Sequence, residues 1–163
     1  MIVYHGSTEI IKNPDVVHSK KYLDFGRGFY ITTFENQAKK WAVRKGMRQE
    51  KAAIVNVYEL SEAWDDFKVL SFEKENEKWL DFVCACRKGQ SLNKEYDIII
   101  GNVADDDVFK TVDMYFRGLW NKEKVLGELR YYKMNNQICI VNQETLNRLI
   151  TFKRAYEVKD HGR

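Results

Sequence analysis

The sequence contains little that would interrupt or cross-link a fold. It has a single proline, Pro14, and three cysteines among 163 residues. Scarce proline favours long regular elements, because proline removes a backbone donor and breaks helices and central strands. The first residues, MIVYHGS, show no signal-peptide pattern, and the cysteine count is odd. Together these features predict reduced thiols and a cytoplasmic protein.

Long apolar runs and the common catalytic signatures are also missing. No window approaches the roughly 18 apolar residues of a membrane-spanning helix, so we expect no contact with a membrane. The G-x-x-x-x-G-K-[ST], H-E-x-x-H and G-x-S-x-G motifs are absent, and the histidines are scattered, which predicts no metal site. Gly26-Arg27-Gly28 lacks the third glycine of a dinucleotide-binding fingerprint and precedes a strand rather than a helix.

The residues that are present suit one globular domain. The chain is 44% hydrophobic, 13% aromatic and 31% charged, which excludes disorder. No stretch rich in proline, glycine or serine divides it, so we expect a single domain over residues 1–158 and a frayed tail over 159–163. The net charge of +3 is too small for a dedicated nucleic-acid binder.

Hydrophobic periodicity predicts an α+β fold. The pattern indicates strands over residues 2–4, 29–32, 52–58, 68–72, 96–100, 137–141 and 151–158. It indicates helices over residues 35–48, 74–87, 108–119, 122–133 and 144–150. Strands and helices mix without strict alternation, which is typical of the α+β class.

Two cysteines lie on the second predicted helix. The spacing of Trp79, Phe82, Val83 and Cys86 is that of an amphipathic helix. At about 100° per residue, Cys84 and Cys86 point about 200° apart. They therefore cannot share a metal, and we expect Cys86 in the core.

Two short motifs have the residue types of a ligand site. Tyr4-His5-Gly6-Ser7 ends the first strand and places an imidazole beside accessible backbone groups, which can read an amide or a ribose diol. In the stretch 24–33 (DFGRGFYITT), two glycines allow the chain to approach a ligand closely, and an aromatic on the next strand can offer a ring face. Each motif alone is equally compatible with a structural role.

Taken together, these motifs resemble the ADP-ribosyltransferase superfamily in its histidine–tyrosine–glutamate branch. Ala38-Lys39-Lys40-Trp41-Ala42 strengthens the resemblance. The chain is most similar to a bacterial family of uncharacterised, toxin-like domains, whose pattern includes residues 96–101 (YDIIIG), residues 103–106 (VADD) and a glutamine that opens a late strand. The resemblance covers about residues 2–152.

The resemblance implies a split core of mixed and antiparallel β-sheet with flanking helices. It also implies that the nicotinamide–ribose bond of NAD, a substrate here, is cleaved and that ADP-ribose passes to a protein or nucleic-acid acceptor. His5 would bind ribose hydroxyls, Gly6 the carboxamide, and Tyr30 the nicotinamide ring. The rest of the implied NAD site consists of Tyr4 and Phe29 beneath the ring, Ser7 and Arg27 at the ribose or pyrophosphate, and Gly28 and Thr32. Members of this family are often encoded beside a small partner protein, so the resemblance also implies an antitoxin-like partner.

The sequence departs from this branch at the third catalytic position, where Gln137 stands in place of glutamate. A charge about 5 Å from the developing cation is worth roughly 3 kcal/mol at an effective dielectric near 20. That corresponds to about a hundredfold in rate. Transfer could therefore be slow, or Glu144 or the Asp105–Asp107 cluster could supply the carboxylate. Asp105 and Asp106 are equally compatible with a helix N-cap.

Two other functions fit the same sequence. A binding-only relative would retain the nucleotide or partner site and have lost the chemistry at Gln137. A nucleic-acid-binding or -processing protein would use the basic face over residues 39–51, since residues 35–51 carry six basic and two acidic side chains. That face is also compatible with an ordinary solvated helix.

Overall fold

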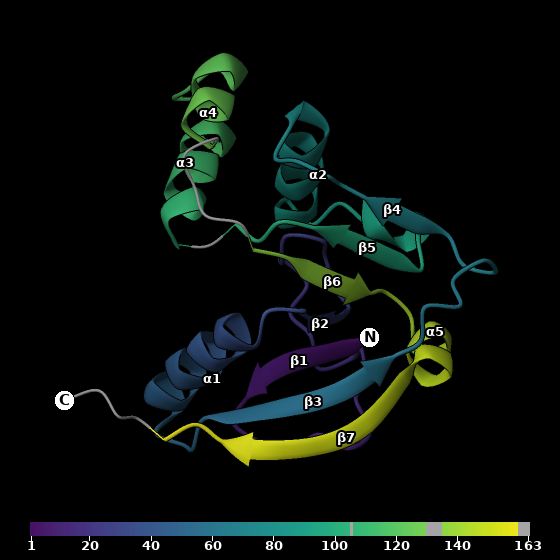
Figure 1. Ribbon diagram of the computed structural model, residues 1–163. Coiled ribbons are helices and arrows are strands. Elements are labelled where there is room, and N and C mark those ends of the chain that lie inside the picture. Colours follow the sequence, from purple (N-terminus) through teal and green to yellow (C-terminus); the bar gives the residue numbers. More distant parts are fainter. Residues whose placement is uncertain (105, 130–134, 160–163) are drawn as a thin grey trace.

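The computed structural model describes residues 1–104, 106–129 and 135–159 and has two sheets (Figure 1). The three-stranded sheet is antiparallel, in the order β1 (Ile2–Ser7), β3 (Ile54–Leu60), β7 (Ile150–Glu157). The four-stranded sheet has the order β2 (Phe29–Ile31), β6 (Gln137–Ile140), β5 (Ile98–Gly101), β4 (Val69–Ser71). This sheet is mixed, because β4 and β5 run parallel.

The described residues also form five α-helices and one 3₁₀ turn. These are α1 (Glu35–Gln49), α2 (Glu77–Arg87), η1 (Leu92–Glu95), α3 (Asp106–Phe116), α4 (Lys122–Leu129) and α5 (Gln143–Leu149). The predicted α+β class and the order of elements are confirmed, apart from the unpredicted η1. Strand β1 extends three residues beyond the prediction. Helix α3 ends earlier than expected, shortly before Gly118, which has a φ of +74°.

Some expectations fall on residues that the structure does not describe. The predicted end of α4 near Lys133 belongs to the undescribed range 130–134, and the predicted tail lies mostly within 160–163. Asp105 is undescribed, and of Asp106 and Asp107 only the backbone is described.

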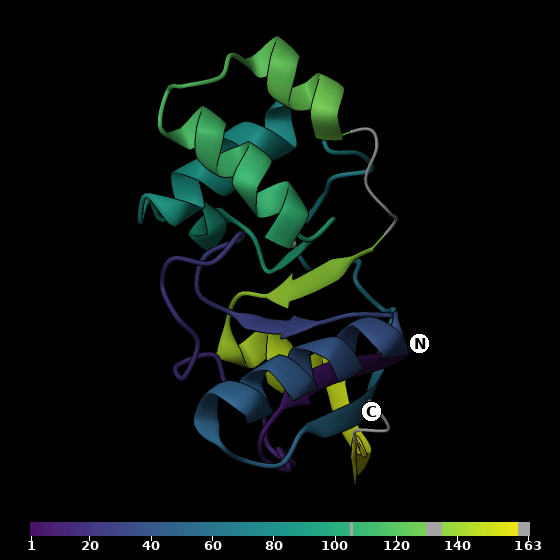
Figure 2. The ribbon, with the colours of Figure 1, turned by 90° about the vertical axis from the view of Figure 1, so that its left-hand side faces the viewer.

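The two sheets pack face to face, with α1 on the outer side of one and α2, α3 and α4 on the outer side of the other (Figures 1 and 2). Strand β3 alternates, as predicted by the sequence pattern over residues 52–58, in which Ile54, Asn56 and Tyr58 face one way. Val55 and Val57 pack with Ala38 and Ala42 of α1. Tyr58 and other buried side chains fill the space between the sheets, together with Val3, Phe29, Ile31, Leu60, Ile98, Ile138, Ile140, Leu146 and Leu149.

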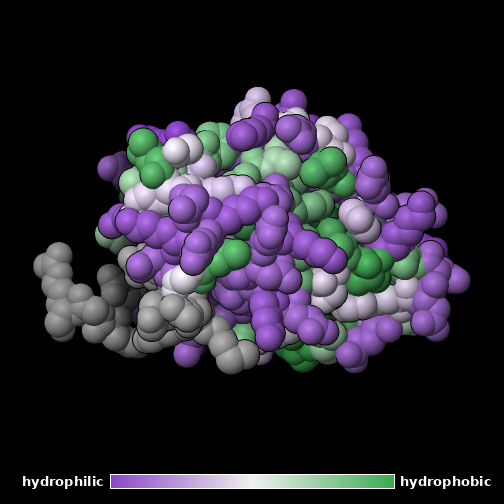
Figure 3. Space-filling model, turned by 90° about the horizontal axis from the view of Figure 1, so that it is seen from above, coloured by the Kyte–Doolittle hydropathy of each residue, from purple (hydrophilic) through white to green (hydrophobic). Residues whose placement is uncertain are grey.

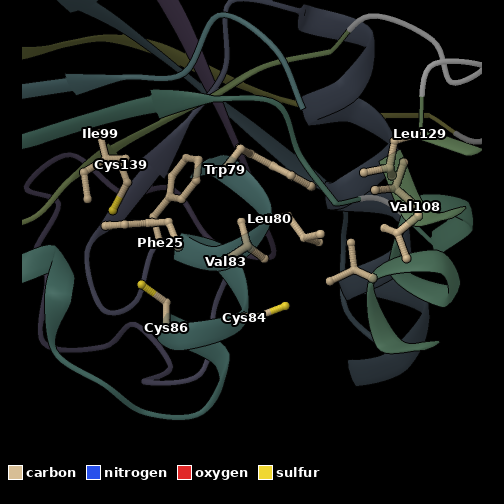
Figure 4. Packing of buried hydrophobic residues seen from close by; sticks show 13 residues of the cluster. Phe25, Trp79, Leu80, Val83, Cys84, Cys86, Ile99, Val108, Leu129 and Cys139 are labelled. Atoms are coloured by element: carbon tan, nitrogen blue, oxygen red, sulfur yellow. The ribbon is translucent and has the colours of Figure 1, made fainter. Parts of the chain in front are cut away.

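A second apolar cluster lies between the four-stranded sheet and its helices (Figure 4). Trp79 is fully buried there, as its helical spacing predicts. The sulfur atoms of Cys84 and Cys86 point in different directions, as expected (Figure 4). Burial raises the pKa of Cys86 to about 12. Within the described residues, no group of histidine, cysteine and carboxylate side chains could hold a metal ion.

The helical spacing of Val108, Val112, Tyr115 and Phe116 predicts that the Phe116 ring lies in the core, and this prediction is wrong. Its ring is 37% exposed. The reason is its position, because Phe116 is the last residue of α3 and the helix does not continue over the cluster.

Buried polar side chains fix the long connection between β1 and β2. The Asn56 amide, which is fully buried, accepts from the Ile11 amide N–H at 2.8 Å and donates to the Glu9 carbonyl at 3.0 Å. The Tyr58 hydroxyl donates to the Ile11 carbonyl at 2.6 Å. These bonds replace the regular pairing that the connection lacks, and they set the path of the chain away from β1.

The surface over α2–α4 is mostly polar, with separate apolar areas (Figure 3). Among the helices that the structure describes, none is both long and apolar enough to cross a membrane.

The contact between α1 and β1 depends on Gly6. A Cβ atom there would lie 2.3 Å from the Ala38 carbonyl oxygen and 2.7 Å from the Ala42 nitrogen. Gly6→Ala should therefore displace α1 and destabilise the protein by about 1–3 kcal/mol, measured by urea unfolding. Gly118→Ala is the control, because its Cβ would meet nothing within 4 Å and only its positive φ resists the change. Equal losses in the two variants would contradict this prediction.

Candidate functional site

Among the described residues, one isolated backbone bridge joins the two sheets, between Tyr4 of β1 and Thr32, which directly follows β2. The Tyr4 N–H donates to the Thr32 carbonyl at 2.8 Å, and the Thr32 N–H donates to the Tyr4 carbonyl at 3.0 Å. Beyond this isolated bridge the two strands part, and we call this place the split. Backbone groups alternate in direction along a strand, so the N–H and C=O of Gly6 face the same edge as those of Tyr4. The Gly6 backbone therefore lies at the split.

The side chain of His5, on β1, reaches across the split to the backbone of β2. Its Nδ1 lies 2.6 Å from the Tyr30 carbonyl oxygen, and its ring stacks on Phe29 with centroids 4.5 Å apart. A carbonyl oxygen only accepts, so Nδ1 carries the proton and Nε2 presents a lone pair. Burial, reinforced by the nearby Lys45 ammonium, lowers the pKa of His5 to about 4, although the bond to Tyr30 opposes this. His5 is therefore a neutral hydrogen-bond acceptor at physiological pH.

Lys45 brings a positive charge to the split. Its Nζ donates to the Gly6 carbonyl at 3.1 Å. Burial lowers its pKa, and the neighbouring charges of Arg48 and Lys20 lower it further. The sequence marked Lys45 only as one residue of a basic helix face. The structure separates it from the rest of that face by directing it toward Gly6.

Tyr30 uses its hydroxyl to hold the loop that precedes it. The hydroxyl donates to the Gly26 carbonyl at 2.5 Å and accepts from the Phe25 N–H at 3.0 Å. Burial raises its pKa well above the usual value. The side chain lies on the helix-covered face of its sheet, because Tyr30 pairs with Cys139 of the second cluster. His5 thus touches the backbone of Tyr30 rather than its ring.

Gln137 lies on the same face as Tyr30. It precedes Cys139 by two residues in β6, and side chains two apart share a face. The side chain is 4% exposed, and its Nε2 donates to Asp24 Oδ2 at 3.0 Å and to the Asn102 carbonyl at 3.3 Å. The predicted trio is thus joined through β2, with Tyr30 and Gln137 on one face and His5 at the split.

Asp24 and Arg87 complete this polar group, and the sequence assigned neither of them a role. Asp24 Oδ1 accepts from Nε of Arg87 at 3.0 Å and from its Nη2 at 2.5 Å. Oδ2 accepts from the Ala104 N–H at 2.9 Å, besides the Gln137 amide. Asp24 is the first residue of the glycine-containing motif over residues 24–33, so its position in the sequence could have marked it as a candidate site residue. Nothing in the sequence connects it to Arg87, 63 residues away.

Of the two predicted alternatives for the carboxylate, the structure describes only the side chain of Glu144, and it does not contact Gln137. Glu144 is exposed in the first turn of α5, which follows the far end of β6. Asp105 lies outside the described residues, as do the side chains of Asp106 and Asp107. Among the side chains that the structure describes, Asp24 is the carboxylate that contacts Gln137.

The remaining predicted residues divide between the split and the framework. Phe29 lies beneath the His5 ring, whereas Tyr4 packs toward α1. Thr32 is buried, and its hydroxyl donates to Asn136 Oδ1 at 2.8 Å. Three others contact only neighbouring parts of the fold. The Ser7 hydroxyl accepts from the Glu9 N–H, and the Arg27 carbonyl accepts from the Asn93 amide. Gly28 is packed so closely that a Cβ atom there would lie 2.4 Å from Cys139 Sγ.

The hydrogen bond between Gln137 and Asp24 explains why an amide suits this position. Gln137→Glu would place a second carboxylate about 3 Å from Asp24, with one guanidinium for both. We expect a loss of about 1–3 kcal/mol at pH 7. The raised pKa of the new acid would make this loss vanish as the pH falls below the unfolded value of about 4.3. The exposed Gln90→Glu is the control in urea unfolding across pH, and an equal effect there would contradict the explanation.

The low pKa of His5 can be measured directly. In labelled protein, the imidazole signal that disappears in His5→Gln should titrate near pH 4 rather than 6.5. Because the folded state holds His5 neutral, His5 makes stability fall as the pH drops from about 6.5 to 4, and His5→Gln should lack that contribution. Lys45→Met should raise the His5 pKa, while Lys153→Met, on β7, should leave it unchanged. A midpoint near 6.5 in the unaltered protein would refute the assigned environment.

Comparison with known proteins adds one finding. No curated protein matches this chain. A model of one protein family matches residues 1–152, a range that includes His5, Asp24, Tyr30, Lys45 and Gln137. The chain therefore belongs to the family described as a protein of unknown function, DUF3990.

Proposed function

We propose that this protein is an NAD-dependent mono-ADP-ribosyltransferase. The observation that carries the proposal is the split, where His5 on β1 is bonded to the Tyr30 backbone on β2 and the Gly6 backbone faces the same gap. The two sheets part beside these residues, which supports the split core that the sequence resemblance implies. The imidazole and the backbone amide come from one motif and the Tyr30 ring from another, 25 residues away, which supports a ligand-binding role for the two motifs together.

In this proposal each group at the split has a separate task. The Nε2 lone pair of His5 accepts from a ribose hydroxyl, since Nδ1 is held by the Tyr30 carbonyl. The Gly6 backbone reads the nicotinamide carboxamide. The Tyr30 ring, which lies outside the split on the helix-covered face of the edge strand β2, offers its face to the flat heterocycle. The Lys45 ammonium, 3.1 Å from the Gly6 carbonyl, attracts the pyrophosphate. Fixing ribose and nicotinamide in one pose favours cleavage of the bond between them.

The charge around Gln137 favours slow transfer. The reaction develops positive charge at the anomeric carbon, as in glycoside hydrolysis. Asp24 brings a carboxylate to Gln137, but Arg87 offsets that charge through two hydrogen bonds. The net electrostatic help is therefore smaller than a free glutamate would give. An acceptor protein or nucleic acid and a small antitoxin-like partner belong to this proposal through the sequence resemblance.

A binding-only relative is the second candidate, and the engaged amide of Gln137 favours it. This reading predicts that NAD binds without being cleaved. A nucleic-acid-binding protein acting through α1 has less support, because two cations of that face have intramolecular partners. Lys45 contacts the Gly6 carbonyl, and Lys39 lies over the Tyr156 ring.

The proposal is tested by NAD binding and transfer together. NAD at about 100 times its Kd should stabilise the protein by about 2.7 kcal/mol. That raises Tm by roughly 5–10 °C for a chain of this size. Labelled NAD should yield free nicotinamide and a labelled acceptor in a lysate.

Tyr30→Ala should abolish both the thermal shift and the transfer. Tyr30→Phe keeps the ring and loses the two loop hydrogen bonds, so it should retain the shift at a lower starting Tm. Tyr115→Ala, on α3, is the control for loss of a tyrosine. A thermal shift without nicotinamide release would favour the binding-only relative, and no shift at all would overturn both readings.

A further inference from the structure

A pocket of about 350 Å³ lies outside the split, among the loop before β2, the end of α2 and the outer side of α3. Its lining includes three rings, Tyr22, Phe109 and Phe116, which are 63%, 45% and 37% exposed. The Asp24–Arg87 pair and Asp113 supply its polar groups. Three accessible aromatic rings around one hollow are unusual on a surface that is otherwise mostly polar (Figure 3).

Each of these rings is paired with a cation. The Arg87 guanidinium lies 4.4 Å from the Phe109 centroid. Lys88 lies 5.1 Å from the Phe116 centroid, and Lys21 lies 5.7 Å from that of Tyr22. The pocket therefore combines flat apolar faces with positive charges close beside them.

The carboxylates of the lining are matched by arginines. Asp24 is bonded twice to Arg87, and Asp113 lies 3.0 Å from the Nε of Arg117. The lysines at the rings thus leave the rim with a positive balance. This charge complements an anion attached to whatever enters between the rings.

The walls of the pocket are fixed at two places, one by the backbone and one by an ion pair. Gly89 has a φ of +86°, and a Cβ there would lie 2.8 Å from the Tyr22 ring, so the missing side chain gives that ring its place. Arg87 is only 15% exposed and held by Asp24, so the guanidinium that faces Phe109 is fixed as well. Two of the ring environments are consequently formed before any ligand binds, which lowers the cost of binding.

Aromatic faces with adjacent cations match one ligand chemistry. Bases of single-stranded nucleic acids stack on aromatic side chains while their phosphates meet Lys and Arg. A volume of about 350 Å³ is near the lower limit of ligand pockets, so it suits one nucleotide rather than a dinucleotide such as NAD. Asp113 can accept a hydrogen bond from the amino group of a base.

We propose that this pocket binds a nucleotide, with the base between Tyr22, Phe109 and Phe116 and the phosphate at Lys21 and Lys88. This activity is independent of the proposed transfer of ADP-ribose, although both sites share Asp24, whose Oδ2 contacts Gln137. The pocket rings Tyr22, Phe109 and Phe116 do not belong to the split, so the two proposals can fail separately. The nucleotide has two possible sources, a free mononucleotide or a unit of a single strand.

The test measures binding of both sources to the full chain. Fluorescence polarisation would use labelled eight-nucleotide single strands of mixed sequence, and unlabelled AMP, GMP, CMP and UMP would compete. Phe109→Ala and Tyr22→Ala should each weaken binding about tenfold. Lys88→Gln should reduce the slope of log K against log salt by about 0.7 if a strand is bound. Competition by mononucleotides at the affinity of the strand would identify the free nucleotide as the ligand.

Phe34→Ala is the matched control, because Phe34 is also a partly exposed phenylalanine, at 42%, and does not line the pocket. Circular dichroism would establish that each variant folds, and the exposure of Tyr22 offers a second substitution if Phe109→Ala unfolds. The proposal is overturned if neither strands nor mononucleotides bind. It is equally overturned if the Tyr22 and Phe109 variants bind as tightly as the Phe34 variant.

Discussion

The buried carboxylate of Asp24 connects four segments through its hydrogen bonds. It accepts from the α2 side chain Arg87, from the backbone before α3 at Ala104, and from Gln137 of β6, while it belongs to the loop before β2. Removing one partner of such a buried pair typically costs about 3–5 kcal/mol, since the other charge stays desolvated. The position of the helical layer over the four-stranded sheet depends on this group, as does the loop that Tyr30 holds.

The fold was largely predictable because its elements are amphipathic with clear periods. Alternation in β3 places Val55 and Val57 toward α1 and Tyr58 toward the other sheet, as the structure shows. The errors concern ends. Helical spacing continued to Leu119, whereas α3 ends at Phe116, because a helix is terminated by backbone conformation at residues such as Gly118, which periodicity does not register. Pairing between strands was not predictable, since β1 joins β3 more than 45 residues away.

The candidate site was predictable only where its residues are neighbours in sequence. His5 with Gly6, and Tyr30 with its glycine loop, form local motifs. Asp24 bonds to Gln137 across 113 residues, and Lys45 reaches Gly6 across 39. Neither separation leaves a local pattern. The glycines also carried an ambiguous signal, because Gly6 and Gly28 are required by close packing against Ala38 and Cys139, whatever ligand the nearby groups bind.

The same packing explains why a neutral residue stands at 137. An amide can donate to Asp24 and to the Asn102 carbonyl at once, whereas a carboxylate can donate to neither unless it is protonated. Once Asp24 and Arg87 occupy this interior, glutamate would leave the cluster with one negative charge too many. Glutamine in place of glutamate at position 137 therefore suits the carboxylate of Asp24, and each of the two residues restricts what the other can be. Any chemistry at the split must work with a carboxylate that is already shared between a guanidinium, a backbone amide and Gln137.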